Sequence, residues 1–391
     1  MQSPLFPKAA KDSLDSDVAA HYGDLSGEQW ALEKGTAFSD MSDMGIVTVS
    51  GPDRLSWLTT ISSQVVDPMT PADSKELLLL DANGRISFAA AVLDDGEKTT
   101  LLVEGDRADA LVEFLESMKF MLRVSIENAT ERVGVVGAIV PSNHEAINRA
   151  REDVAEYPGY LVSWVDPWPG VVEGGASYTQ PGFEHPAKPR TRILHLIERD
   201  KLTQFAEEWA DDGGKWAGRI AWEALRIEDF RPRWGREVDE KSVPHELDWL
   251  RTAVHLNKGC YSGQESVARI VNMGKPPRRL VLLQLDGSES KTVKPGDEVQ
   301  AKGRAVGRVT SVARHADWGP IALAVIRRGI AIEVLLDVVT EEGPIIAAQE
   351  MIVDPAGKSS QSPKERPGKD LRGIRRGVEG HRPIGGMGLS K

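Results

Sequence analysis

Residues that build disulfide frameworks, metal sites and membrane spans are scarce in this sequence. The 391 residues include one cysteine, so no internal disulfide can form, and we expect a reducing compartment, the cytoplasm. The longest apolar runs, such as 321–326, are far too short to cross a bilayer, and we expect neither a secretory signal nor membrane contact. Cys-x-x-Cys, His-Glu-x-x-His and calcium-loop motifs do not occur, so we predict no dedicated metal site.

Positive charge is also scarce, except near the C-terminal end. The formal net charge is −11, yet residues 356–391 carry nine basic and three acidic residues, so the remainder carries −17. An acidic body repels polyanions, and we therefore expect no direct RNA binding except through this basic tail. Because the tail is rich in Gly, Pro, Ser and Arg and poor in apolar residues, we predict that residues 354–391 are disordered.

The rest of the chain is ordinary globular sequence, 40% apolar and long enough for two or three domains. Strand-like alternation at 77–80 and 86–93 flanks Asn83-Gly84, a strong hairpin signal. Helical and strand-like segments interleave without the rhythm of parallel crossovers, so we predict an α+β fold. Short apolar runs with turn signals from 279 to 353, after a double-proline linker, predict a small antiparallel β-barrel.

A helix is predicted around residues 217–225, whose apolar positions recur at i, i+3, i+4, i+7 and i+8. Arg219, Glu223 and Arg226 fall on its opposite face, and three further arginines follow within ten residues. Such a face is either solvated or an anion clamp, because guanidinium groups bind carboxylates in a two-pronged geometry.

The lone cysteine, Cys260, stands in the run Lys-Gly-Cys-Tyr-Ser-Gly-Gln-Glu. Ser262 followed by Glu265 is a capping-box pattern that predicts a helix start, and Gly274 stands where this helix would end. Lys258 and the helix start would both favour a thiolate at Cys260. The alternative is an inert cysteine that serves as a small buried apolar side chain.

This run, followed by Ala268-Arg269, resembles the signature of the YgfZ family, folate-binding relatives of the glycine-cleavage T protein (aminomethyltransferase). Further blocks that resemble the family lie at 51–58, 81–85, 221–228, 244–248 and 303–311. The matched blocks extend from about residue 37 to residue 353.

The resemblance implies a T-protein-like architecture of three domains, with two α+β domains forming a folate channel and a C-terminal β-barrel. The implied regions are an N-terminal extension (1–24), a first α+β folate-binding region (25–132), a second one that carries the cysteine motif (133–275), the barrel (278–353) and the basic tail (354–391). The implied working groups are Cys260 and Lys258, beside the channel. Tetrahydrofolate or a derivative would be bound with the help of Arg226, Tyr261, Gly263, Gln264, Glu265 and Arg269.

By the same resemblance, the protein would support assembly or repair of iron–sulfur clusters in client enzymes, with indirect effects on tRNA modification. We expect it to act as a monomer. T proteins carry paired aspartates just beyond the hairpin, and one of them contacts the folate. This sequence has Phe88 and Ala89 at the aligned positions, which argues against aminomethyl transfer. Two alternatives stay open: a folate-dependent one-carbon transferase with altered acid–base groups, and a non-catalytic folate-sensing or docking module.

Overall fold

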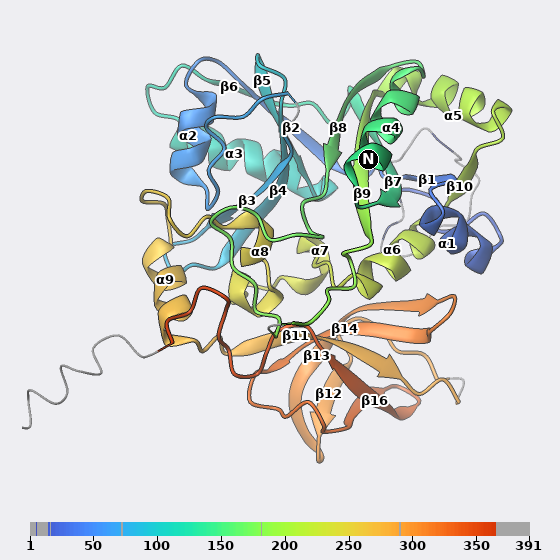
Figure 1. Ribbon diagram of the computed structural model, residues 1–391, viewed down its shortest axis with the longest axis vertical. Coiled ribbons are helices and arrows are strands. Elements are labelled where there is room, and N and C mark those ends of the chain that lie inside the picture. Colours follow the sequence, from blue (N-terminus) through green and yellow to red (C-terminus); the bar gives the residue numbers. More distant parts are fainter. Residues whose placement is uncertain are drawn as a thin grey trace, which may run out of the picture.

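The structure is a computed structural model that describes residue 5, residue 15 and residues 17–364, apart from residues 72, 181, 289 and 290. Within these ranges the chain forms two five-stranded sheets and one closed barrel. Figure 1 shows the two sheets side by side, with the barrel beneath them. This arrangement confirms the predicted α+β class with a C-terminal antiparallel barrel. No helix in the described ranges combines the length and apolar character needed to span a bilayer.

The first sheet is antiparallel and has the order β3-β4-β5-β2-β6. Its strands are β2 (Gly45–Ser50), β3 (Lys75–Leu80), β4 (Ile86–Asp94), β5 (Lys98–Val103) and β6 (Ser125–Asn128). One face packs against α2 (Arg54–Ile61) and α3 (Ala108–Met118), the latter preceded by a 3-10 turn (Gly105–Arg107). β3 alternates as expected, with Leu77 and Leu79 toward these helices and Leu78 in the core on the other side. In β4, Phe88 packs toward the helices and Ile86 toward the other core, because the ladder shifts register between Leu79 and Leu80.

The hairpin predicted at Asn83-Gly84 is confirmed by the pairing of β3 with β4. Gly84 adopts a φ of 77°, a left-handed conformation that costs a glycine little. The Asp81 carboxylate accepts the backbone N–H groups of Asn83 and Arg85, at 2.8 Å each, so that the turn is held from within.

The second sheet has the order β10-β1-β7-β9-β8, and only its β1–β10 pair is parallel. Its strands are β1 (Ala37–Asp40), β7 (Val133–Pro141), β8 (Tyr160–Val165), β9 (Arg190–Glu198) and β10 (Lys215–Ala217). Helices α4 (His144–Ala155) and α5 (Leu202–Asp211) contribute to the core on one face, and the 3-10 turn Arg199–Lys201 leads into α5. Helix α1 (Leu25–Glu33) and β1 join this second sheet, although the sequence analysis had placed them in the region 25–132.

Helix α6 (Arg219–Glu228) packs between the second sheet and the barrel. Its predicted apolar stripe is buried, including Ala221, Ala224 and Leu225. The charged face is buried as well, because barrel strand β13 covers it, so the solvated alternative is wrong. After α6 come short helical turns: α7 (Trp234–Glu237), η3 (Pro244–Leu247) and α8 (Leu250–Ala253).

The barrel closes in the order β11-β14-β13-β12-β15-β16. Its strands are β11 (Arg278–Leu285), β12 (Glu298–Ala301), β13 (Arg304–His315), β14 (Gly319–Arg327), β15 (Leu336–Thr340) and β16 (Gly343–Met351). Successive side chains along each strand point alternately into the barrel and outward. In β11, Val281 and Leu283 lie inside the barrel, whereas Leu280 and Leu282 pack against the helical turns and α9 (Gln264–Met273).

Residues 354–364, which we predicted as the start of a disordered tail, pack against the body. The Asp354 and Ser360 amides donate to the Tyr178 and Ser177 carbonyls, and the Ser362 hydroxyl donates to the Val271 carbonyl at 2.7 Å. The rest of the predicted tail, residues 365–391, lies outside the described residues.

Candidate ligand cavity and cysteine loop

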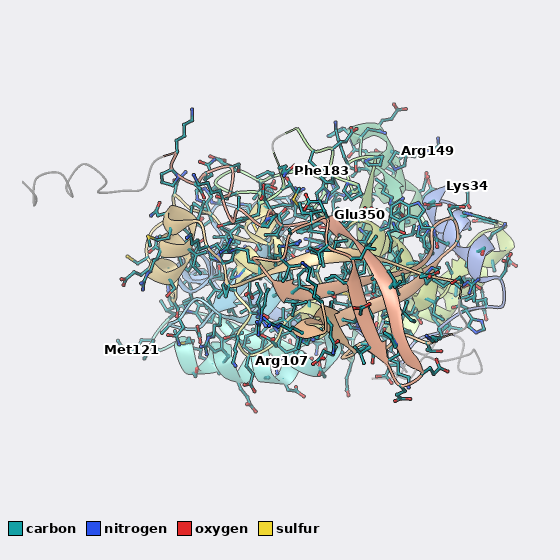
Figure 2. The ribbon with its side chains drawn as sticks, turned by 90° about the horizontal axis from the view of Figure 1, so that it is seen from below. Lys34, Arg107, Met121, Arg149, Phe183 and Glu350 are labelled. Atoms are coloured by element: carbon teal, nitrogen blue, oxygen red, sulfur yellow. The ribbon has the colours of Figure 1, made fainter. Side chains whose placement is uncertain are left out.

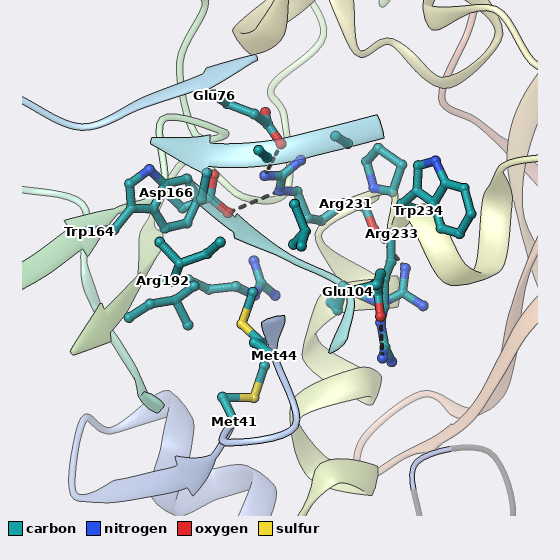
Figure 3. A pocket seen from close by; sticks show the side chains of 18 of the residues that line it. Met41, Met44, Glu76, Glu104, Trp164, Asp166, Arg192, Arg231, Arg233 and Trp234 are labelled. Carbon is teal, nitrogen blue, oxygen red and sulfur yellow. Dashed lines mark hydrogen bonds and ion pairs between the residues drawn. The ribbon is translucent and has the colours of Figure 1, made fainter. Parts of the chain in front are cut away.

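A cavity of about 140 Å³ lies between the two sheets (Figure 3). Its walls come from β3, β4 and β5 of the first sheet, from β8 and β9 of the second, from α6 and from the segment 231–234. Four tryptophans line it: Trp164, Trp222, Trp234 and Trp249. A small-molecule site usually measures about 300–1,000 Å³. The cavity can therefore hold a compact ring system, and a longer ligand would have to extend beyond it.

Buried ion pairs surround the cavity. Arg231 bridges Glu76 at 2.6 Å and Asp166 at 3.0 Å, and its guanidinium lies 4.9 Å from the Trp168 ring centre. Burial would lower the pKa of Arg231, but the charges of Asp166 and Glu76 outweigh it and raise that pKa above its ordinary value. This arginine is therefore permanently charged.

A second pairing lies at the other end of the cavity, where Arg233 contacts Glu104 at 2.7 Å and Arg219 pairs with Asp43. Burial raises the pKa of Asp43 despite the nearby Arg219. At Glu104, burial is outweighed by Arg233, and the pKa is lowered. The two carboxyl groups therefore differ in acidity although both face arginines.

Several donors that line the cavity lack an acceptor. Among the described residues, the buried N–H groups without a hydrogen-bond partner include Arg192 Nε, Arg231 Nη1, Trp234 Nε1 and Trp249 Nε1. Arg192 Nη2 lies 2.7 Å from Asp229 Oδ2 as an ion pair, but without hydrogen-bond geometry. Figure 3 shows the Arg192 side chain extending into the pocket. Buried donors normally have a hydrogen-bond acceptor, so this set of four N–H groups indicates a binding place for a ligand rich in acceptors.

Arg226, the predicted carboxylate-binding residue, lines the cavity but is already fully engaged. Its three guanidinium nitrogens donate within the protein, to Glu223 (2.8 and 3.0 Å), Glu237 (3.1 Å), the Arg231 carbonyl (2.7 Å) and Ser311 (2.7 Å). This network joins α6 to α7 and to β13. The geometry favours Arg192 over Arg226 as a direct ligand contact.

The two positions aligned with the T-protein aspartates point to opposite sides of β4. Phe88 is buried under α3, where its ring lies 5.6 Å from that of Phe114. Ala89 lines the cavity. The cavity wall thus has a methyl group at the position where the T protein would place a carboxylate.

Cys260 lies on an exposed loop before α9, so the alternative of a buried cysteine is wrong, while the reactivity of the thiol stays a prediction. It does not line the cavity between the sheets. The structure therefore separates the thiol from the cavity wall, in contrast to the predicted place beside the ligand channel.

Lys258 is directed toward helix α2. Its ammonium group donates to the carbonyls of Thr59 and Ser62 at the C-terminal end of α2, and it lies 4.7 Å from the Tyr261 ring centre. Cations are favourable at such helix ends. Burial lowers the pKa of Lys258 to about 8 and raises the pKa of Tyr261 to about 12. Lys258 thus anchors the cysteine loop to the first domain.

The predicted helix over the motif is present, but it starts differently. Helix α9 begins at Gln264 with Gly263 as its N-cap, in a left-handed conformation and without a side-chain cap, so the predicted capping box of Ser262 and Glu265 is wrong. The end at Gly274 is confirmed. Gln264 donates to the Lys258 carbonyl at 3.2 Å.

Gly263 packs against the β3–β4 hairpin. A Cβ atom at this position would lie 2.5 Å from the Asp81 carbonyl oxygen and 2.7 Å from the Gly84 Cα. Two blocks far apart in the sequence therefore meet here through their glycines. Glu265 and Arg269 are exposed on α9, away from the cavity wall.

One group of described residues has the spacing of a possible metal site, Glu33, Glu228 and His315, whose ligand atoms lie within 4.8 Å of one another. Arg190 pairs with both glutamates, at 3.1 Å with Glu33. Because Arg190 already pairs with both carboxylates, and His315 lies 3.1 Å from Glu228, the group is a partly buried ion-pair network.

Sequence reasoning missed Arg192 and the four tryptophans. Arg192 sits within the β-like run of β9, with no motif around it, and the tryptophans come from four separate segments. Arg231 and Arg233, by contrast, belong to the three arginines after α6 that the sequence offers as part of an anion clamp. The available sequence signal for Arg192 was a cationic residue directly before the apolar, strand-like pair Ile193-Leu194.

Comparison with known proteins agrees with this architecture. No family model matches the chain. An aminomethyltransferase of Thermotoga maritima is 23% identical over 370 residues, covering 89% of this chain and 95% of that protein. One of Streptomyces avermitilis is 26% identical over 329 residues, covering 79% and 82%. A putative chloroplastic transferase of Arabidopsis thaliana is 24% identical over 288 residues, which are 72% of this chain but only 62% of the plant protein.

The solved structure of the glycine cleavage system aminomethyltransferase T from Bartonella henselae has a TM-score of 0.67 to this chain at 15% identity, covering 89% of this chain and 94% of that one. The chain is therefore homologous to aminomethyltransferases and has a T-protein-like fold, as predicted. The YgfZ family is a finer assignment, and it stays a prediction.

Proposed function

We propose that this T-protein-like chain binds a reduced folate in the cavity between its two sheets and does not catalyse aminomethyl transfer. The observation that carries the proposal is the group of buried, unpartnered N–H donors in a tryptophan-lined cavity. Aminomethyltransferase homology makes a folate the first ligand to consider.

The residues present fit a pterin ring. In a reduced folate the pyrimidine half of the pterin stays flat, which suits tryptophan walls, while the reduced half is puckered; the carbonyl oxygen accepts hydrogen bonds, and the amino and ring N–H groups donate them. Arg192 Nε and Trp249 Nε1 are donors that lack acceptors, and Glu223 Oε1 is a buried acceptor without a hydrogen-bonded donor. The cavity supplies both kinds of group that such a ring requires.

The same cavity argues against transfer chemistry. General acid–base catalysis needs a titratable group within reach of the reacting atoms. Ala89 provides none, and each carboxyl group in the described cavity lining is already paired with an arginine: Glu76 and Asp166 with Arg231, Asp43 with Arg219, Glu104 with Arg233, and Glu223 with Arg226. Binding of the folate is thus separated from one-carbon transfer.

Calorimetric titration with tetrahydrofolate tests the binding proposal. Arg192→Gln should weaken binding about tenfold or more, because a charged donor to the ligand contributes about 1.5–3 kcal/mol. Arg149→Gln is the matched control, since Arg149 lies on the outer surface (Figure 2) with its side chain 81% exposed. Absence of any titratable heat with the folded wild-type protein, at up to millimolar tetrahydrofolate, would refute the proposal.

We further propose that Cys260 is the working group in support of iron–sulfur clusters of client enzymes. The thiol is exposed, and its loop is held by Lys258 and Gly263 against the first domain. An exposed thiol that loses its proton can form one sulfur–iron bond with a cluster iron and release it again when the proton returns. The cluster is the cargo in this scheme.

Cys260→Ala should leave tetrahydrofolate affinity and thermal stability unchanged, because the side chain is exposed and outside the cavity wall. It should abolish the activity of iron–sulfur client enzymes in cells that depend on this protein. Ser262→Ala, at an exposed neighbouring position, serves as the control. Full complementation by the Cys260→Ala protein would remove the thiol from the mechanism.

Aminomethyl transfer is the second candidate, favoured by the homology over most of the chain. Incubation with methylene-tetrahydrofolate and an amine donor decides between the two. Catalytic exchange of the one-carbon unit would establish a transferase that uses other acid–base groups than the T-protein pair.

A further inference from the structure

The carboxylate of Asp15 is held inside a cluster of arginines at the edge of the cavity. Arg233 donates to it through Nη2 at 2.8 Å and through Nη1 at 3.2 Å, and Arg236 donates through Nη2 at 2.8 Å. Asp15 is buried, with 7% of its surface exposed. This geometry is that of a bound carboxylate between two guanidinium groups.

A third arginine, Arg219, acts on the same carboxylate. Burial would raise the pKa of Asp15, but the positive charges of Arg219, Arg233 and Arg236 outweigh it and lower that pKa well below its usual range. Arg219 is 3% exposed, and its Nε has no hydrogen-bond partner. The cluster therefore has donor capacity beyond what Asp15 uses.

The arginine cluster stands where two hollows meet. The first is the ring-sized cavity between the sheets, with Arg219, Glu223 and Arg233 in its wall. The second measures about 290 Å³, lies between α6 and the barrel, and is lined in part by Asp15, Arg219, Glu223 and Arg236. Since Arg219 and Glu223 belong to both walls, the two hollows are adjacent, and a ligand that fills the first would end against Arg219 and Arg233.

Main-chain amides contribute little to this site. The N–H groups of Arg219 and Ile220 at the start of α6 donate to the Ala19 and Ala20 carbonyls, at 2.9 and 3.1 Å. The Gly218 N–H donates to Glu28 at 2.9 Å. The anion preference of the site therefore comes from the guanidinium groups.

We propose that Arg219, Arg233 and Arg236 form a carboxylate subsite for the tail of an elongated ligand whose ring lies in the cavity, and that Asp15 is an internal competitor for this subsite. The inference rests on the proposed function and adds the chemistry of the ligand tail, an acyclic carboxylate. A cluster that holds one carboxylate in two-pronged geometry will hold another of the same shape. Because both cannot occupy it together, the affinity for the tail is reduced by the fraction of time that Asp15 is bound.

Asp15→Asn and Asp15→Ala remove the competing charge. Tetrahydrofolate, which has a glutamate tail, should bind each variant about tenfold more tightly than wild type, corresponding to about 1.4 kcal/mol. The affinity for 6-methyltetrahydropterin, which has the ring but no carboxylate, should not change. Asp211→Asn, the same charge change at an exposed position of α5, is the matched control and should bind both ligands as wild type does.

A second readout does not depend on folate. Citrate at millimolar concentration should raise the Tm of the Asp15→Asn protein but not of the Asp211→Asn protein, and adding Arg236→Gln should abolish this rise. If wild type binds tetrahydrofolate but Asp15→Asn shows neither tighter binding nor a citrate effect, the subsite is refuted and the proposed function stands. If no protein binds folate while citrate stabilises Asp15→Asn selectively, the subsite stands and the proposed function fails.

Discussion

At the scale of single residues, the cysteine loop shows how a motif can have a role different from the one its composition suggests. Lys258 beside Cys260 indicates a thiolate partner, yet its ammonium group binds the end of α2. Ser262 and Glu265 have the spacing of a capping box, yet Gly263 is the N-cap of the helix. Sequence spacing determines which groups are near one another along the chain. The contact that each group makes depends on its neighbours in the fold, here α2 for Lys258 and the hairpin at Asp81 for Gly263.

Gly263→Ala should therefore destabilise the loop. A left-handed conformation costs an alanine about 1–2 kcal/mol, and the added Cβ would lie 2.5 Å from the Asp81 carbonyl oxygen. We expect the free energy of unfolding in urea to fall by about 2 kcal/mol and alkylation of Cys260 by a maleimide to change in rate. Gly259→Ala is the control, because a Cβ there meets nothing within 4 Å. Equal stability of the two variants would contradict this account of the loop.

At the scale of elements, the sequence predicted α6 correctly as a helix, but it did not predict that the charged face of this helix is buried. The apolar stripe identified the face that packs on the second sheet. The charged face is covered by β13 of the barrel, with Arg226 bound to Ser311, a residue 85 positions away. Hydrophobic periodicity distinguishes apolar from polar faces, but it cannot distinguish a polar face in water from one buried in an ion-pair network.

Arg226→Met tests this burial. The substitution would leave Glu223 and Glu237 buried without their shared cation, which costs about 3–5 kcal/mol of unfolding free energy. Chemical denaturation measures the loss, and Arg269→Met on the exposed side of α9 should change stability by less than about 0.5 kcal/mol. A loss under about 1 kcal/mol at Arg226 would mean that its guanidinium is free to serve a ligand.

At the scale of the whole molecule, the architecture was predictable and the cavity was not. Long matched blocks and turn signals identified the α+β body and the barrel, because these features are local in sequence. The cavity wall combines segments as distant as Met41, Ala89, Arg192 and Trp249. No local pattern brings these residues together; the order of strands in two sheets does.

The last described residues have a bearing on how the molecule is made. Ser362 holds the Val271 carbonyl near the end of α9, and Ser360 and Asp354 hold the segment around Tyr178. Synthesis proceeds from the N-terminus, so α9 leaves the ribosome about ninety residues before its last hydrogen-bond partner. The end of α9 can thus make this contact only after residue 362 has been synthesised, and a shorter nascent chain would lack it.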